Sequence, residues 1–161
     1  MEKPFRIRVG DPQRDRSAML SFIDGLQAFE HAMEPNRRLD DTVAADHMGV
    51  LEKRLAERGG AMFIAEDDSG LLGWSVVHET LDDLFIVESE RLTAYIDELY
   101  LTEKARGLGA GGALIRACED WAKARGIRVI MIGVLAKNGH AHAVYNAAGY
   151  DDYALHLRKY L

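Results

Sequence analysis

The segment that decides the fold is Arg106-Gly107-Leu108-Gly109-Ala110-Gly111-Gly112. It follows an alternating apolar stretch, Leu92 to Leu101, which predicts a strand, and it precedes a helix predicted over Ala113 to Arg125. Amide groups at the start of a helix lack partners within that helix, and the helix dipole adds about half a positive charge there. Because glycines let a ligand approach the backbone, the segment predicts a pyrophosphate site. The alternative is a tight turn that only starts the helix.

Two common nucleotide-binding patterns fit this segment poorly. Gly107, Gly109 and Gly112 match the dinucleotide fingerprint G-x-G-x-x-G formally. However, no acidic residue that would grip a ribose stands near Gly133 to Lys137, and only about 50 residues remain for the rest of a dinucleotide fold. A P-loop is excluded, because the segment contains no Gly-Lys-Ser or Gly-Lys-Thr.

Two motifs in sequence order resemble those of one superfamily. Arg106-x-x-Gly109-x-Gly111 resembles the acyl-CoA pyrophosphate loop of the GCN5-related N-acetyltransferases, Q/R-x-x-G-x-G/A. Downstream, Asn138-x-x-Ala141-x-x-x-Tyr145-x-x-x-Gly149-Tyr150 is similar to the segment N-x-x-A-x-x-x-Y-x-x-x-G-F/Y of that superfamily, with Tyr where Phe is commoner. The likeness is close from Thr93 to Tyr150, and the preceding part agrees only in the order of its elements.

The order of predicted elements indicates an α/β (α+β) fold: a mixed, mostly antiparallel central sheet with helices on both faces. The resemblance implies the acyl-CoA N-acyltransferase fold of this superfamily, as a single domain over residues 1–161. The stretch Val129 to Leu135 is continuously apolar, which predicts a strand buried on both faces. Tyr150 to Leu161 is predicted as a last, bent strand, and the pattern from Glu79 to Glu90 leaves both helix and strand open. The other predicted strands are Phe5–Val9, Ala61–Glu66 and Leu71–His78, and the other helices are Arg14–Glu30, Asp40–Gly59 and Asn138–Ala148.

Composition excludes several classes of protein. The 161 residues include 20 Lys and Arg against 26 Asp and Glu, so the net charge is −6. A nucleic-acid partner is disfavoured, since phosphate binding relies on clustered basic residues. No apolar run is long enough to cross a membrane or to form a secretory signal, and the single cysteine, Cys118, excludes an intrachain disulfide. We therefore expect a cytoplasmic protein without a membrane partner.

The resemblance implies how coenzyme A would be held. The amides from Arg106 to Gly112 would bind the pyrophosphate, and the backbone of Leu99, Tyr100 and Leu101 would pair with the pantetheine arm like an added strand. Strands Leu92–Leu101 and Val129–Leu135 would part to admit it. A free backbone amide at Leu99 or Tyr100 would stabilise the negative charge that develops on the thioester oxygen.

The resemblance also implies catalytic residues. Tyr145 would protonate the leaving thiolate or donate a hydrogen bond to it, and the alternative is an aromatic residue that packs on the sheet. Asn138 would contact the cofactor, cap its helix, or both. Glu98 is the candidate base for the amine, and the alternative is a partner for a nearby arginine. Strand alternation predicts that Ile96, Glu98 and Tyr100 share one face and that Asp97 faces away.

Other side chains have simpler interpretations. His140 and His142 have a spacing found in metal sites, but they lack a third ligand, so we expect an exposed pair and no metal. Cys118 is expected to be a buried small apolar residue. Trp74 is compatible with either the core or an acceptor cleft.

The resulting hypothesis is an enzyme that transfers an acetyl group from acetyl-CoA directly to a primary amine within a ternary complex. Carboxylates gather in the segments 22–46 and 81–90, which the resemblance associates with the acceptor, and they suit a small cationic amine; an ordinary solvated surface is the alternative. A non-catalytic acyl-CoA-binding or sensing module is the alternative function, and a dinucleotide-dependent oxidoreductase is the third. Dimers are common in the superfamily, so a homodimer is compatible with the sequence, although no interface is marked.

Overall fold

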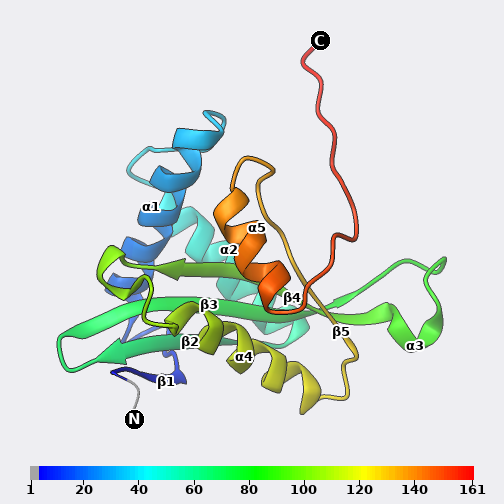
Figure 1. The fold of residues 1–161 in the computed structure, drawn as a ribbon, viewed down its shortest axis with the longest axis horizontal. Coiled ribbons are helices and arrows are strands. Elements are labelled where there is room, and N and C mark those ends of the chain that lie inside the picture. The colour runs from blue at the N-terminus through cyan, green and yellow to red at the C-terminus, as the bar shows by residue number, and fades with distance from the viewer. Residues whose placement is uncertain (1–3) are drawn as a thin grey trace.

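The computed structural model describes residues 4–161 and has a five-stranded sheet at its centre, in the order β1-β2-β3-β4-β5. The strands run antiparallel from β1 to β4, whereas β4 and β5 are parallel (Figure 1). Their bounds are β1 Arg6–Val9, β2 Gly60–Asp67, β3 Gly70–Leu81, β4 Leu92–Leu101 and β5 Val129–Ile132.

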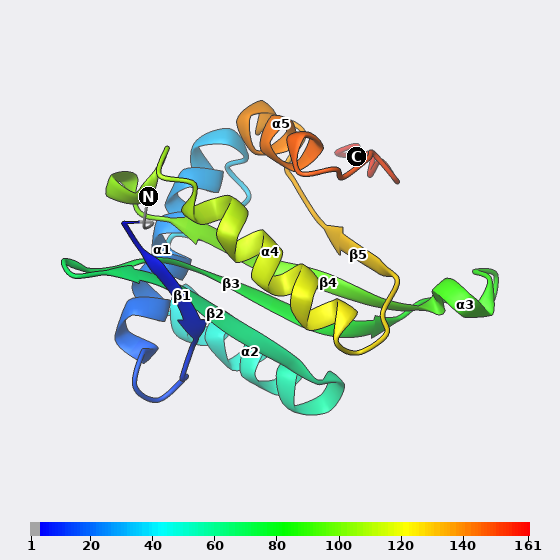
Figure 2. The ribbon, with the colours of Figure 1, turned by 60° about the horizontal axis from the view of Figure 1, so that its bottom comes forward.

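Helices cover both faces of this sheet (Figure 2). α1 (Arg16–Met33) and α2 (Val43–Arg58) pack on one face, and α4 (Ala110–Lys123) packs on the other. α5 (Gly139–Ala147) follows β5, while the short helical turns α3 (Glu88–Arg91) and η1 (Glu103–Ala105) flank β4. The predicted fold class, a mixed and mostly antiparallel sheet with helices on both faces, is confirmed.

Apolar side chains form a core on each face, because alternate residues of a strand point to opposite sides. Trp74 on β3 is fully buried against α1 and α2, and its ring lies 6.3 Å from that of Phe22. On the other face, the buried thiol of Cys118 donates a hydrogen bond to the hydroxyl of Ser75 over 3.3 Å. Trp74 is therefore a core residue, and the prediction of a buried Cys118 is confirmed.

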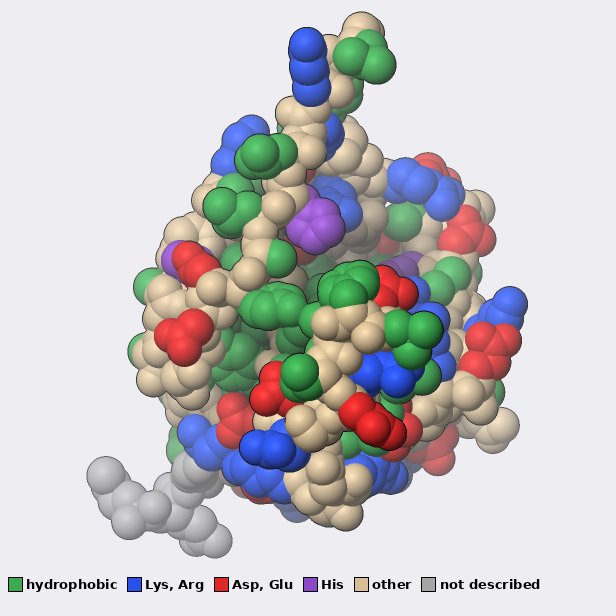
Figure 3. Space-filling view, turned by 90° about the vertical axis from the view of Figure 1, so that its right-hand side faces the viewer, with side chains coloured by type: hydrophobic (Ala, Val, Ile, Leu, Met, Phe, Trp, Pro, Cys, Tyr) green, Lys and Arg blue, Asp and Glu red, His purple; other side chains and the backbone are tan. Residues whose placement is uncertain are grey.

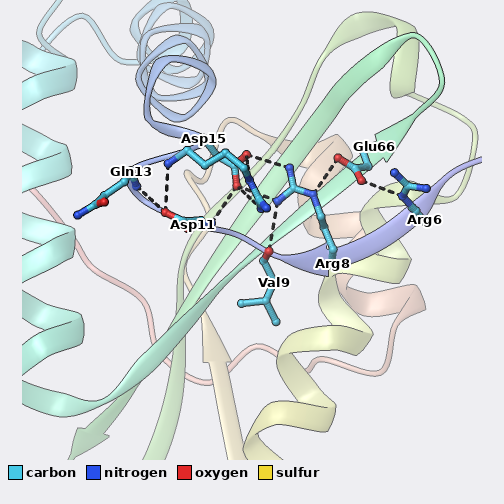
Figure 4. A network of polar contacts seen from close by, with 8 residues as sticks. Arg6, Arg8, Val9, Asp11, Gln13, Asp15 and Glu66 are labelled. Carbon is cyan, nitrogen blue, oxygen red and sulfur yellow. Dashed lines mark hydrogen bonds and ion pairs between the residues drawn. The ribbon is translucent and has the colours of Figure 1, made fainter.

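A network of ion pairs fastens β1 to the start of α1 (Figure 4). Arg8 donates two hydrogen bonds, of 2.7 and 2.9 Å, to the buried carboxylate of Asp15, and a third of 2.8 Å to Glu66 on β2. The hydrogen bonds from Arg8 hold the pKa of Asp15 well below its usual value. Since Asp15 directly precedes α1, this network helps to fix where the helix begins.

β4 carries a one-residue bulge at Asp97. Val76 of β3 pairs with Glu98 and Val77 pairs with Ile96, so no residue of β3 stands opposite Asp97 in the strand register. An extra residue reverses the alternation of the side chains that follow it. Glu98 therefore contacts α2, whereas Ile96 packs toward α4. The predictions that Ile96 and Glu98 share a face and that Asp97 faces away from Glu98 are wrong, since Asp97 also contacts α2.

The predicted last strand, Tyr150 to Leu161, does not form. Residues 151–161 have no regular secondary structure and are exposed throughout. β5 is consequently the last strand of the sheet, and its four residues are half-buried rather than buried on both faces as predicted. The prediction failed because apolar alternation favours a strand without specifying the neighbour with which that strand must pair.

The segment from 79 to 90, which the sequence pattern leaves open, is divided between three conformations. β3 continues to Leu81, an irregular loop follows, and α3 begins at Glu88. This excursion extends from one end of the sheet (Figure 1). It is exposed, with Leu84 and Phe85 retaining 84% and 83% of their accessible surface.

Candidate active site

The two parallel strands β4 and β5 part halfway along β4. Their pairing runs from Thr93 with Val129 to Ile96 with Ile132 and then stops. β4 continues to Leu101, so Asp97 to Leu101 have no partner strand on this side within residues 4–161. The bulge at Asp97 lies at the point of separation and bends the strand there. The backbone groups of Asp97 to Leu101 on this side of β4 are therefore available to pair with an extended ligand.

The glycine segment lies at the end of β4 that leads into α4. Gly107 and Gly109 adopt positive φ angles of 78° and 82°, which disfavour residues with a side chain. Within the described chain, the amides from Gly107 to Gly112 donate no hydrogen bond, whereas the next amide, that of Ala113, donates to the carbonyl of Gly109. The prediction that the Arg106 amide belongs to this free set is wrong, because it donates to the carbonyl of Glu103 over 3.2 Å and closes the short helical turn η1. Free amides at the positive end of a helix dipole are groups that can bind an anion.

The end of α1 lies beside this loop. The guanidinium of Arg106 is 5.8 Å from the ring centroid of Phe29 on α1. Lys137, in the loop after β5, donates to the carbonyl of Met33 over 3.0 Å and pairs with Glu34 over 3.1 Å. The end of α1 is thus tied both to the glycine segment and to the loop that leaves β5.

Asn138 caps α5, because its side-chain oxygen accepts a hydrogen bond of 3.1 Å from the amide of Ala141. The capping role is therefore confirmed, and a contact with a cofactor stays a prediction. Tyr145, two turns along α5, is half-buried. Burial, assisted by the negative charge of Glu30 on α1, raises the pKa of Tyr145 to about 12. The phenol consequently keeps its proton at neutral pH.

Glu98 is the buried carboxylate of the site, with 6% of its surface exposed. Its Oε1 lies 2.5 Å from Nε2 of His47, a partly exposed residue of α2. Its Oε2 is buried and has no hydrogen-bond partner among the described residues. A buried carboxylate oxygen without a donor costs free energy, so this atom favours a ligand that brings a proton donor.

Two further groups respond to Glu98 electrostatically. The hydrogen bond to Glu98 raises the pKa of His47, which extends its protonated form to higher pH. Burial, together with the nearby charge of Glu98, raises the pKa of Glu30. Glu30 also pairs with Arg37 over 3.2 Å. The site thus combines two carboxylates, one imidazole and one phenol from four different elements.

Asp97, next to Glu98, is held differently. Its carboxylate pairs with Arg54 of α2 over 2.5 Å and with His78 of β3 over 3.0 Å. Burial alone would raise the pKa of Asp97, but the hydrogen bonds from His78 and Arg54 outweigh it and lower the pKa. Asp97 is therefore a satisfied structural carboxylate, whereas Glu98 retains an unpaired oxygen.

The sequence did not predict that His47 and Glu30 lie near Glu98. His47 falls on the inward side of the predicted second helix, which was the available signal, but its partner Glu98 lies 51 residues away along the chain. Most other acidic residues of the segment 22–46 are neutralised. Arg38 pairs with Asp40 and Asp46, and Glu34 pairs with Arg158 as well as with Lys137.

The second acidic segment, 81–90, lies away from the site. β4 begins directly after α3, and Glu98 is six residues further along this strand, or about 20 Å at the usual rise of a strand.

Within residues 4–161, no helix is both long and apolar enough to cross a membrane. His140 and His142 lie on α5, where His142 pairs with Asp152 rather than with another histidine.

Comparison with known proteins gives consistent matches. Residues 25–150 match the model of a family described as the acetyltransferase (GNAT) family. The chain is 25% identical over 124 residues to the uncharacterized N-acetyltransferase YhfO of Bacillus subtilis (strain 168), covering 77% of this chain and 79% of that protein. It is 27% identical over 110 residues to aminoglycoside N(6')-acetyltransferase type 1 of Stenotrophomonas maltophilia, covering 68% and 71% of the two chains.

A solved structure with the same architecture is that of a predicted acetyltransferase from Clostridium acetobutylicum with acetyl-CoA. It has a TM-score of 0.75 and 20% sequence identity, and the match covers 97% of this chain and 96% of that one. At this identity the likeness establishes the fold, and the function has to be argued from the site.

Proposed function

The chain belongs to the acetyltransferase (GNAT) family, and on that premise we propose that it transfers an acetyl group from acetyl-CoA to a primary amine by direct attack within a ternary complex. The observation that carries the proposal is the combination of unpaired amides at the start of α4 with the unpaired, buried Oε2 of Glu98. The first feature suits an anionic cosubstrate, and the second suits a cationic acceptor.

For acetyl-CoA, the amides of Gly107 to Gly112 would hold the diphosphate, and the unpaired side of β4 at Leu99, Tyr100 and Leu101 would hold the pantetheine arm. Among the described residues, the amides of Gly107 to Gly112 donate no hydrogen bond, which supports this role because the donors are available without breaking existing structure. A backbone amide at Leu99 or Tyr100 would stabilise the charge on the thioester oxygen. One structural neighbour that carries acetyl-CoA supports the choice of cosubstrate.

For the acceptor, Glu98 would take a proton from the incoming ammonium. An alkylammonium has a pKa near 10, so it arrives protonated and must lose a proton before it can attack. The Oε2 atom of Glu98 would accept that proton, and His47, 2.5 Å from Oε1 and partly exposed, would pass it to solvent. Glu98 is thus the proposed general base, with His47 as its positioning and relay residue.

Tyr145 would act on the leaving thiolate. Its pKa of about 12 lies well above the value of about 8.5 for a thiol. Complete proton transfer from the phenol to the thiolate is therefore unfavourable, and we assign Tyr145 the donation of a hydrogen bond that stabilises the departing sulfur. The solvent or the ammonium proton would complete the protonation.

The acceptor we propose is a small cationic amine. Glu98 has a buried oxygen without a partner, and its negative charge reaches Glu30, so a ligand that brings positive charge is favoured beside Glu98. The relative named as an aminoglycoside acetyltransferase supports this class of acceptor.

We further propose that residues 1–161 form one domain. We propose that this domain works in the cytoplasm, where a single unpaired cysteine stays reduced. Its proposed partners include neither nucleic acid nor membranes. No metal is required for this chemistry.

The test is an assay of free CoA thiol released from acetyl-CoA in the presence of different amines, together with calorimetry of acetyl-CoA and of NAD. The proposal expects acetyl-CoA to bind and thiol to be released with a polyamine or an aminoglycoside. Binding without release in any amine would identify a sensing module instead. Turnover with anionic amino acids alone would refute the cationic acceptor, and binding of NAD in place of acetyl-CoA would refute the whole assignment.

A further inference from the structure

The carboxylate of Glu30 faces inward from α1. Glu30 follows Ile23 by seven residues and Met19 by eleven, and both of these apolar side chains are buried. Seven and eleven residues are close to whole numbers of helical turns, so the three side chains share one face of α1. The apolar stripe of the helix therefore ends in a carboxylate, whose side chain is 23% exposed. A charge is unusual at such a position unless it has a partner.

α1 carries Glu30 past the face of β4 on which Glu98 lies. The ring of Phe22 on α1 is 5.8 Å from that of Tyr100, which follows Glu98 by two residues on β4. A side chain at Gly25 would collide with the hydroxyl of Tyr100, so the helix and the strand are in direct contact here. Glu30 is five residues beyond Gly25, or about 7.5 Å along the helix. The inward face of α1 at Glu30 is thus next to the part of β4 that carries the proposed base.

α5 borders the same region. The loop before α5 is tied to the end of α1 through Lys137, and Figures 1 and 2 both show α5 beside the second half of α1. Burial raises the pKa of Tyr145 on α5, and the negative charge of Glu30 adds to this effect. The charges of Glu98 and His47 act on Glu30 in turn. Glu30 therefore lies within electrostatic reach of the groups to which the proposed reaction assigns roles.

Arg37 pairs with Glu30 but leaves it incompletely satisfied. Its Nε lies 3.2 Å from Oε2 of Glu30, yet this nitrogen is buried and has no hydrogen-bond partner among the described residues. No residue in the described part of the chain donates a hydrogen bond to the Glu30 carboxylate. Arg37 is held by its backbone, whose carbonyl oxygen is 2.7 Å from Nδ1 of His31. The oxygens of Glu30 are thus open to a better placed donor.

We propose that Glu30 determines acceptor specificity by binding a second ammonium group, while Glu98 receives the ammonium group that is acetylated. The acceptor is then an amine with at least two cationic nitrogens, such as an aliphatic diamine or an aminoglycoside. An ammonium brings three donors on one nitrogen, and charge-assisted hydrogen bonds to a carboxylate are the strong ones. This inference rests on the proposed function, because it places the second end of an acceptor within the same site.

The opposite assignment would make Arg37 the recognition group, for an acceptor that carries a carboxylate. The unpaired Nε of Arg37 favours that assignment. However, the guanidinium stands against Glu30, and the buried Glu98 adds a second negative charge to the region. Like charges brought together at a binding site cost several kcal/mol, so an anionic acceptor is disfavoured.

The acidic segment 81–90 offers a matched control. Figure 3 looks onto the end of the sheet from which this segment extends, and it shows acidic side chains on the surface there. Glu88 in this segment is exposed and has no ion pair with any described residue. Glu88→Gln therefore removes the same charge as Glu30→Gln, but away from Glu98.

The experiment compares kcat/KM, measured by release of free CoA thiol, for amines that differ in their second group. Putrescine and cadaverine carry a second ammonium, butylamine and pentylamine carry none, and γ-aminobutyrate carries a carboxylate. The diamines should exceed the monoamines by about 10-fold or more, the value of a hydrogen bond between charged groups. Glu30→Gln should lose this preference and keep its turnover of monoamines, whereas Glu88→Gln should keep the preference. Kanamycin tests the aminoglycosides, and its KM should rise in Glu30→Gln only.

Equal values for diamines and monoamines, with no effect of Glu30→Gln on kanamycin, would overturn the assignment of Glu30 and leave acetyl transfer intact. A preference for γ-aminobutyrate would overturn it in favour of Arg37. If Glu30→Gln loses turnover of every amine, Glu30→Asp decides: it keeps the charge and should retain the preference, and loss of the preference there would also overturn the proposal. Absence of thiol release with every amine in the unchanged protein would refute the proposed function, and this inference with it.

Discussion

The Nε2 atom of His47 lies 2.5 Å from Oε1 of Glu98, and this contact joins α2 to β4 next to the bulge where β4 leaves β5. Glu98 is buried, whereas His47 has 37% of its side chain exposed. The pair therefore links a buried carboxylate to solvent. The imidazole and the carboxylate are joined by this hydrogen bond, so a change at either group acts on the other.

This coupling predicts the pH dependence of the reaction. The hydrogen bond to Glu98 raises the pKa of His47 above its usual value, so at lower pH the imidazole is protonated and cannot accept a further proton. The ratio kcat/KM should rise with pH through this raised value. In His47→Gln the titrating imidazole is absent, so this rise of kcat/KM should move to lower pH. The rise caused by deprotonation of the amine acceptor, near pH 10, should stay in place. An unchanged profile would exclude His47 from the proton path.

Glu98→Gln should lower kcat by about 10²- to 10⁴-fold, the usual contribution of a general base. Its affinity for acetyl-CoA should stay the same, because the amide keeps the shape of the side chain. The control is Asp97→Asn, which removes a charge from the neighbouring residue. Asp97 is already paired with Arg54 and His78, so this variant should lower the melting temperature more than it lowers kcat. Equal kcat losses in both variants would refute a specific role for Glu98.

Tyr145→Phe should lower kcat by about 10- to 100-fold, the value of one hydrogen bond to a charged group. The dissociation constant of acetyl-CoA, measured by calorimetry, should change little. Tyr153→Phe is the matched control, since that phenol is exposed in the C-terminal segment. If Tyr145→Phe turns over as fast as the unchanged enzyme, Tyr145 has only a packing role.

Substitution of two glycines with positive φ distinguishes an effect on acetyl-CoA binding from an effect on the stability of the fold. Gly109 has a φ of 82° in the loop before α4, and Gly126 has a φ of 71° after it, with open space around both. Alanine at either position should cost about 1–2 kcal/mol of stability, from strain in the left-handed conformation. Gly109→Ala alone should also weaken acetyl-CoA binding, by about 10-fold or more, because the amides that face the diphosphate shift. Equal affinities in the two variants would argue against the loop as the binding site.

Local features of the fold could be predicted from the sequence. The strand predicted over Leu92 to Leu101 has these bounds in the structure, and Asn138 caps the helix that it was predicted to start. Each of these features depends on residues that are neighbours in the chain. The glycine segment likewise combines a turn and a helix start within seven residues, so its unpaired amides follow from local geometry.

Features that depend on distant residues could not be predicted. The bulge at Asp97 adds one residue to β4, and the residue types around it do not mark its position. Strict alternation therefore placed Ile96 on the wrong face of the strand. The pairing of His47 with Glu98 requires the packing of α2 on β4, which no local pattern encodes. The C-terminal segment has the alternation of a strand, yet whether it pairs depends on an edge that lies outside its own sequence.

The most direct measurement is a crystal structure of the protein with acetyl-CoA. Our account predicts diphosphate oxygens within about 2.7–3.2 Å of amide nitrogens between Gly107 and Gly112, and the thioester arm along the unpaired side of β4 between Asp97 and Leu101. A complex in which the diphosphate binds elsewhere while these amides stay free would contradict it.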